Sequence, residues 1–165
     1  MIRSVIKQLI ALSAVFCCFF ITGCDGGYDC ALDNIAYYRI KFYHINTNGT
    51  EAEYAFPEPL TVSMMINGRA SIVVNYITNA KELSLPMSYA NDCDTVILNF
   101  FDRYNDTLYI GHRNNPIYQS MECGVIMHHK LTTTAHTGNF IDSMAINNAD
   151  INFENNENIK LYFIE

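Results

Sequence analysis

The side chains best suited to metal chemistry are histidines and a group of aspartates. His128 and His129 are adjacent, while His112 and His136 lie on either side of them in the sequence. Zinc needs three or four converging ligands, and neighbours on a strand point to opposite faces, so this pair cannot easily share one ion. Four aspartates could offer carboxylates to calcium, but their spacing matches no calcium-binding loop: Asp92, Asp94, Asp102 and Asp106. We therefore expect no metal ion.

Residues for covalent or acid–base catalysis are present without a recognisable arrangement. Nucleophilic catalysis would need a serine or cysteine beside a base. Ser120, Ser143 and Cys93 are available, but none lies in a Gly-x-Ser-x-Gly or comparable signature. Glu122 and Asp142 could form a carboxylate pair, although sequence separation says nothing about their distance in space. The sequence therefore assigns no catalytic residue and no cofactor.

Strands must position these side chains, because apolar and charged residues alternate. In the segment 36–44, every second residue from Tyr38 to Phe42 is apolar, and the residues between them are basic. The dipeptide Asn67-Gly68 joins two apolar runs, which is typical of a tight hairpin because both residues tolerate positive φ. The predicted strands are 36–44, 60–66, 70–76, 83–86, 95–101, 107–111, 124–133, 141–147 and 159–164, with a turn at 102–106.

The spacing of these strands predicts the fold class. Strands recur every 10 to 15 residues with Asn, Asp and Gly turns, and no segment has a long helical stripe. This pattern favours an all-β protein, an antiparallel β-sandwich of immunoglobulin-like or jelly-roll-like type. We expect one such domain over residues 30–165, after a signal peptide at 1–23 and a short tether at 24–29.

Composition excludes several classes of protein. Of the 165 residues, 50 % are hydrophobic and only 16 % are charged, which argues against a coiled coil or a disordered chain. The net charge of −7 argues against binding nucleic acid through its phosphates.

The first residues predict export and lipidation. Arg3 and Lys7 precede an uncharged stretch, 9–21, that suits a signal peptide and is too short to span a bilayer. The sequence Ile21-Thr22-Gly23-Cys24 that follows resembles the lipobox of bacterial lipoproteins, in which the cysteine becomes the first mature residue and carries acyl chains. Removing the leader leaves 8 basic and 17 acidic residues, a charge of −9. Membrane contact is therefore expected through acyl chains on Cys24, not through a basic patch.

Three thiols remain in the mature chain, and an exported location permits a disulfide. We favour Cys30–Cys123, which would join the start of the domain to a late strand; Cys93–Cys123 is the second choice, and three reduced cysteines are the third. No Cys-x-x-Cys pair is present, which argues against a thioredoxin-like site.

Tyrosines could provide a recognition surface for a protein or a glycan. Several lie on the polar phase of their predicted strands, and we single out Tyr37, Tyr43 and Tyr76 as a candidate binding surface. The alternative is that tyrosine simply favours strands and packs against its cross-strand neighbours. The absence of Trp weakens the glycan interpretation.

Several motifs together resemble a family of small Bacteroidales lipoproteins, the DUF6452 type, whose function is unknown. They are the lipobox at Cys24, Tyr28-Asp29-Cys30-Ala31-Leu32, Leu83-Ser84-Leu85-Pro86-Met87, Asp94-Thr95-Val96, Cys123-Gly124, His136, Ile141-Asp142-Ser143 and Asn158-Ile159-Lys160-Leu161-Tyr162-Phe163. The resemblance favours the lipoprotein interpretation and the Cys30–Cys123 pair, leaves Cys93 as the unpaired thiol, and implies no activity.

We therefore expect a lipid-anchored outer-membrane protein of the bacterial cell envelope, on either the periplasmic or the outer side. Its expected role is non-catalytic, in binding or envelope assembly, with an unknown protein or glycan partner and no nucleic acid. One alternative is a small envelope hydrolase or metal-dependent enzyme. Another is a structural subunit of a surface fibre, which an exposed edge strand would favour.

Overall fold

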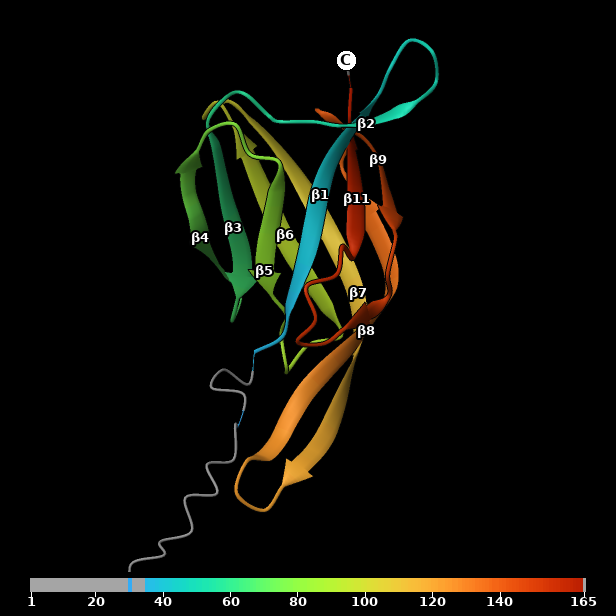
Figure 1. Cartoon of the computed structure of the whole chain (residues 1–165). Helices are drawn as coiled ribbons and strands as arrows, with labels where there is room; N and C mark the ends of the chain where they lie inside the picture. The colour runs from blue at the N-terminus through green and yellow to red at the C-terminus, as the bar shows by residue number, and fades with distance from the viewer. Residues whose placement is uncertain (1–29, 31–34, 165) are drawn as a thin grey trace, which may run out of the picture. The chain divides into compact units, whose positions relative to one another are not determined.

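The chain forms an all-β structure in the computed structural model, which describes residue 30 and residues 35–164 (Figure 1). The predicted signal peptide, the predicted lipidation site Cys24 and the predicted tether at 24–29 lie outside the described residues. The compact unit that carries the fold spans Ala31–Glu165. No helix in its described part is long and apolar enough to cross a membrane.

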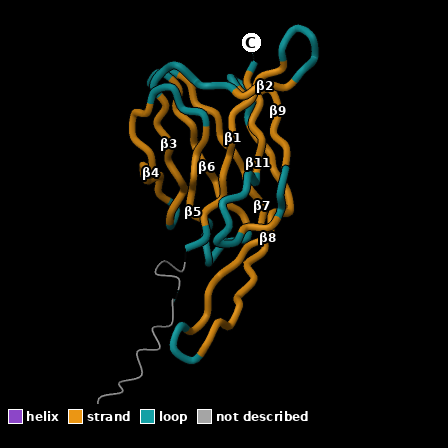
Figure 2. Tube along the Cα trace, viewed as in Figure 1, coloured by secondary structure: helices purple, strands orange, loops and turns teal. Residues whose placement is uncertain are grey.

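Eleven strands make up the described part of this unit, and Figure 2 shows that loops connect them directly. They are β1 (Tyr37–Ile45), β2 (Glu51–Glu53), β3 (Leu60–Ile66), β4 (Arg69–Ile77), β5 (Glu82–Pro86), β6 (Cys93–Phe100), β7 (Tyr104–Ser120), β8 (Gly124–His136), β9 (Ile141–Ile146), β10 (Asp150–Ile151) and β11 (Ile159–Phe163). The predicted strands are all present. Two short strands, β2 and β10, were not predicted, and β7 extends well beyond its predicted range at both ends.

Two sheets pack face to face, as the sequence predicted. One has the order β2-β1-β11-β9 with β5 paired to β1, and the other has the order β10-β8-β7-β6-β3-β4. The pairs are antiparallel with one exception, because β1 and β11 run parallel, with Ile40 opposite Ile159. The predicted antiparallel sandwich is confirmed, with this one parallel pair within it. A parallel pair needs a long connection, and here most of the chain separates the two strands.

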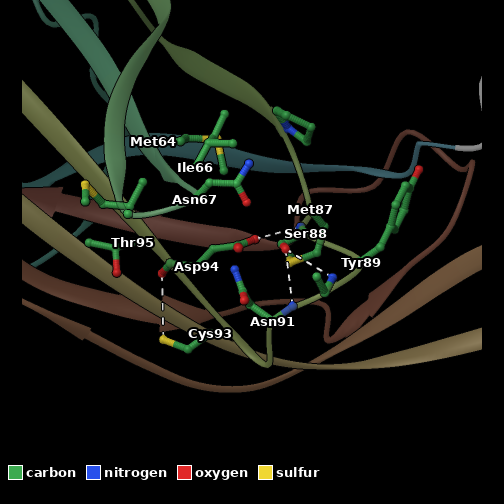
Figure 3. A pocket seen from close by; sticks show the side chains of 14 residues that line it. Met64, Ile66, Asn67, Met87, Ser88, Tyr89, Asn91, Cys93, Asp94 and Thr95 are labelled. Atoms are coloured by element: carbon green, nitrogen blue, oxygen red, sulfur yellow. Dashed lines mark hydrogen bonds between the residues drawn. The ribbon is translucent and has the colours of Figure 1, made fainter.

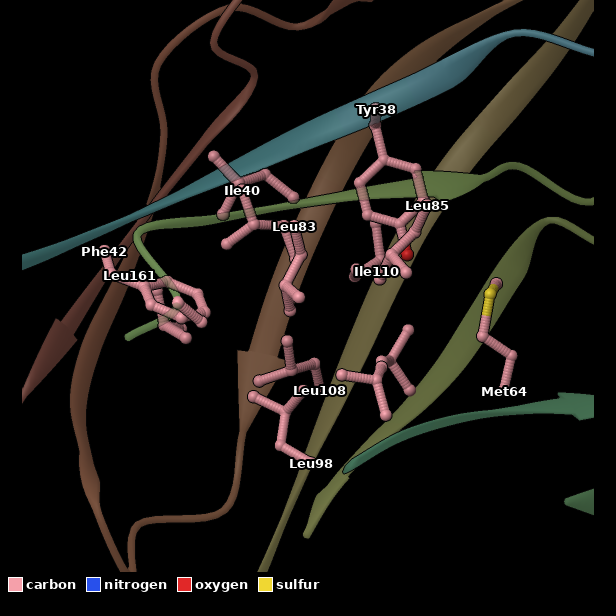
Figure 4. Close-up of a cluster of buried hydrophobic side chains, with 14 of the residues drawn as sticks. Tyr38, Ile40, Phe42, Met64, Leu83, Leu85, Leu98, Leu108, Ile110 and Leu161 are labelled. Atoms are coloured by element: carbon pink, nitrogen blue, oxygen red, sulfur yellow. The ribbon is translucent and has the colours of Figure 1, made fainter. Parts of the chain in front are cut away.

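The core fills the space between the sheets with side chains that alternate along each strand. Figure 4 shows Tyr38, Ile40 and Phe42 of β1 and two leucines of β5 facing aliphatic side chains from the other sheet. Burial alternates along β6 in the same way, at Asp94, Val96, Leu98 and Phe100. Period-two alternation thus gives each sheet one apolar face, and burying these two faces drives the sheets together.

The predicted hairpin at Asn67-Gly68 is confirmed in detail. Asn67 and Gly68 have φ of 51° and 76°, the sign that both central residues of a type I′ turn require. Ile66 and Arg69 pair directly across the turn. The hairpin therefore places the end of β3 beside the β5–β6 loop, where a pocket opens.

A buried carboxylate fixes the connection between β8 and β9. Asp106 on β7 is fully buried and accepts hydrogen bonds from the backbone N–H groups of Asn139 (2.8 Å), Phe140 (2.7 Å) and Ile141 (3.2 Å) and from the Thr137 hydroxyl (2.8 Å). Burial alone would raise the pKa of Asp106, but these four hydrogen bonds outweigh it and lower the pKa below its ordinary value of 3.8. Asp106 is therefore ionised at neutral pH and holds the loop in place.

Candidate binding pocket

A pocket of about 440 Å³ opens at one end of the sandwich. Three segments form its walls: residues 64–68 of the β3–β4 hairpin, residues 86–91 at the end of β5 and beyond it, and residues 93–95 at the start of β6 (Figure 3). Its volume falls within the range of small-molecule sites in proteins. These segments are distant in the sequence, so no local motif marks the pocket.

The walls of the pocket combine flexible apolar side chains with one buried acid. Met64, Met65 and Met87 contribute thioethers, which adapt to ligands of different shape. Asp94 also lines the pocket and is only 4 % exposed, because it occupies the first inward-facing position of β6. The backbone N–H of Ser88 donates to Asp94 Oδ2 at 3.0 Å, as Figure 3 shows. The pocket therefore offers thioethers and a carboxylate, together with several neutral polar side chains.

Behind Asp94 lies a fully buried histidine. His112 Nε2 on β7 is 3.6 Å from Asp94 Oδ2, which is too long for a direct hydrogen bond. The hydroxyl of Tyr38 is also buried, and the pKa of Tyr38 is raised by burial and by the negative charge of Asp94. Two polar side chains thus face the acid from the interior of the sandwich.

A small network fastens the pocket loop to the larger sheet. The Asn114 amide donates to the carbonyls of Tyr89 (2.8 Å) and Asn91 (3.2 Å), so its Oδ1 must serve as an acceptor. This oxygen lies 3.0 Å from His112 Nδ1 and 2.7 Å from His129 Nδ1. Both histidines therefore carry their proton on Nδ1, which leaves two buried Nε2 atoms without a hydrogen-bond partner.

His129 is neutral at physiological pH. Burial and the nearby His112 and His128 lower the pKa of His129 to about 4, although Asp94 acts in the opposite direction. Its ring stacks on Tyr89 of the pocket loop, with the centroids 5.8 Å apart and the planes 7° from parallel. His129 therefore serves as a packed, uncharged support for the loop.

The histidines do not assemble a metal site in the described part of the chain. His129 is buried, whereas His128 packs against Phe153 on the other face of β8, as expected for adjacent strand residues. His136 lies away from both, with Nδ1 3.0 Å from the carbonyl of Thr137. Among the described residues, no group of three or more His, Cys, Asp or Glu is placed to hold a metal.

The other candidate catalytic groups are scattered. Ser120 and Glu122 lie at the tip of the β7–β8 hairpin, and Asp142 and Ser143 lie on β9. Cys93 is an exposed free thiol at the pocket, whose Sγ is 3.8 Å from the Asp94 carbonyl. The buried His112 faces Asp94, and the Cys93 thiol contacts the Asp94 backbone carbonyl instead of an imidazole.

The three tyrosines proposed as a binding surface do not form one surface. Tyr43 is buried, and its hydroxyl donates to Glu157 at 2.9 Å, so its pKa is raised by burial and by this bond. Tyr37 is exposed beside a shallow hollow of about 230 Å³, whereas Tyr76 is exposed on β4 of the other sheet. Alternation along the strand predicts that Tyr43 points outward, but its ring is covered by Tyr162, with the ring centroids 5.9 Å apart, and by Lys160, whose Nζ lies 4.9 Å from the ring centroid.

Comparison with known proteins adds a family to this geometry. The model of DUF6452, a family of unknown function, matches residues 59–163, a range that includes the pocket segments and the histidine network. The chain belongs to the DUF6452 family. No curated protein and no solved structure matches it significantly. The site of this DUF6452 protein must therefore be interpreted from its own chemistry.

Among the described cysteines of the DUF6452 protein, two are disulfide-bonded and one is free. Cys30 and Cys123 are both disulfide-bonded, which fits the predicted Cys30–Cys123 pair, and Cys93 is free. Cys123 lies in the turn between β7 and β8, directly before the first residue of β8.

Proposed function

We propose that this DUF6452 protein is a lipid-anchored protein of the bacterial cell envelope that binds a small ligand without catalysis. The lipobox at Cys24 supports the anchor. The pocket at the end of the sandwich is the observation on which the binding role rests, because it has ligand-sized volume, three methionines in its walls and a buried carboxylate in its lining.

The chemistry of the pocket favours a ligand with an apolar body and a cationic, hydrogen-bond-donating head. The methionine thioethers suit an alkyl or aromatic body. Asp94 accepts one bond from Ser88, and a carboxylate has acceptor capacity for more. A charged donor is the head group that compensates best for the burial of this acid.

The first experiment tests the anchor. Cells that express the full chain are labelled with palmitate, and Cys24→Ala and Cys93→Ala variants are compared with the wild type. Label is expected on the wild type and on Cys93→Ala, and not on Cys24→Ala. Label that persists on Cys24→Ala would contradict the proposal.

The second experiment tests the ligand class. Phenethylamine and its neutral analogue phenylethanol are titrated into protein carrying ¹³C-labelled methionine methyl groups, observed by NMR. The signals of Met64, Met65 and Met87 should shift, while Met144 on β9 serves as a control. The amine should bind about tenfold more tightly than the alcohol, because a charge-assisted hydrogen bond contributes about 1.5–3 kcal/mol.

Replacement of the acid provides the matched control. Asp94→Asn should remove the preference for the amine, whereas Asp92→Asn, at an exposed acid in the same loop, should keep it. Equal affinity of the wild type for amine and alcohol would rule out the proposed head group. Unshifted pocket methionines would rule out the binding role.

A further inference from the structure

One hairpin projects beyond both sheets, and it carries an apolar tip. β6 pairs with β7 only as far as Gly111, and β10 pairs with β8 only at His129 and Lys130. In the described structure, residues 116–127 pair only with one another. With Asn115 at their base, we call residues 115–127 the β7–β8 arm (Figure 1). A two-stranded ribbon of this kind is marginally stable on its own, and contact with another surface would stabilise it.

The tip of the arm exposes side chains that suit a lipid interface. Met121 in the turn is 90 % exposed, and Tyr118 and Val125, which are direct cross-strand partners, are 62 % and 52 % exposed. Direct partners project from the same face of a ribbon, so these two side chains lie together. Tyrosine is typical of the water–lipid interface, because its ring is apolar and its hydroxyl is polar.

The charge of the arm also suits a membrane. The mature chain carries a net charge of −9, which disfavours contact with anionic headgroups in general. Glu122 is the one charged residue in the sequence of the arm, residues 115–127. The exposed apolar tip therefore carries little of the protein's negative charge.

The lipid anchor and the disulfide would place this tip near the bilayer. Six residues lead from Cys24 to Cys30, and the length of the chain limits the separation of these two residues to about 22 Å. Cys123 is the last residue of the turn at the tip of the arm. The Cα atoms of two disulfide-bonded cysteines lie about 6 Å apart. A Cys30–Cys123 disulfide would thus hold the arm tip within a short tether of the acyl chains.

We propose that the tip of the β7–β8 arm, formed by Tyr118, Met121 and Val125, lies in the headgroup region of the membrane that holds the acylated Cys24. The arm would act as a second, non-covalent contact that fixes the orientation of the domain on the bilayer. This inference rests on the proposed lipid anchor, and the experiment below separates the two.

The absence of Trp from the chain allows a direct test. Tyr118→Trp places a single fluorophore at the arm tip, and Tyr109→Trp is the matched control, since Tyr109 lies on the same strand within the sheet and is 45 % exposed. Each full-length, lipidated variant is reconstituted into phosphatidylethanolamine–phosphatidylglycerol vesicles that contain brominated acyl chains. Recovery of the protein in the floating vesicle fraction confirms that it is anchored.

The expected result is a blue shift and strong quenching of Trp at position 118, with neither effect at position 109. If the protein floats and both positions behave alike, the anchor stands and the arm inference is overturned. If the protein carries no acyl chain and does not float, the proposed anchor fails and the arm inference fails with it.

Discussion

Two buried aspartates show how neighbouring groups decide what one residue type does. Asp106 accepts four hydrogen bonds from a single loop, so its acceptor capacity is used in holding the fold together. Asp94 accepts one backbone hydrogen bond, faces His112 at 3.6 Å and borders the pocket. The first is therefore a structural acid, and the second is available to a ligand.

Asp106→Asn should destabilise the domain by about 3 kcal/mol at neutral pH, because an amide cannot accept all four bonds and turns an N–H toward backbone donors. The lowered pKa of Asp106 means that its contribution is present above the ordinary value of 3.8 and is lost as the pH falls through the lowered value. The difference between wild type and variant should therefore shrink in acid. Urea unfolding at a series of pH values measures this effect.

The control for this prediction is Asp102→Asn in the exposed β6–β7 turn, where asparagine also tolerates the positive φ of 55°. Its stability should match that of the wild type at every pH. A constant difference between wild type and Asp106→Asn down to strongly acidic pH would show that ionisation of Asp106 is not the cause.

At the scale of elements, sequence periodicity located every long strand but not their full lengths. The core-facing strands alternate clearly, and the Asn67-Gly68 turn has the predicted geometry. β7 beyond Gly111 was missed, because the arm exposes both faces and so has no apolar phase to detect. β2 and β10 were missed because two or three residues cannot show a period.

The edge strand β4 bears on the alternative of a fibre subunit. It is nine residues long and largely exposed, as a strand-accepting edge would be. However, its register with β3 shifts twice, and Tyr76 has a φ of 53°. Bulges of this kind twist an edge and blunt strand addition. The structure therefore favours the pocket over strand exchange as the functional feature.

The candidate site was harder to predict than the fold, for a geometric reason. Asn114 and His129 are direct partners across β7 and β8, but their pairing depends on a bulge at Gly111 and His112 that leaves no mark in the sequence. The burial of Asp94 could have been predicted, because Asp94 lies two residues before Val96 and so faces the core on the same side of β6 as Val96 and Leu98. Its contact with the β5–β6 loop requires the folded chain.

At the scale of the whole molecule, the proposed disulfide should be a major source of stability. Bridging Cys30 and Cys123 would close a loop of roughly 90 residues, which contributes about 4–5 kcal/mol in the chain-entropy model. The Cys30→Ser/Cys123→Ser double variant should lose stability on this scale in urea unfolding, and a reductant should weaken the wild type to the same level.

Cys93→Ser is the matched control, since the Cys93 thiol is free and exposed. It should change the free energy of unfolding by less than about 0.5 kcal/mol. If reduction leaves the wild-type unfolding curve unchanged, the disulfide does not stabilise the domain.

The bonds from Asn114 to the carbonyls of Tyr89 and Asn91 tie the pocket loop to the base of the arm. With the arm seated in lipid, the pocket would lie at the membrane-facing end of the sandwich. An amphiphile could then enter sideways from the leaflet, and its concentration within the lipid would govern occupancy. Binding assays in detergent-free buffer would understate the affinity for such a cargo.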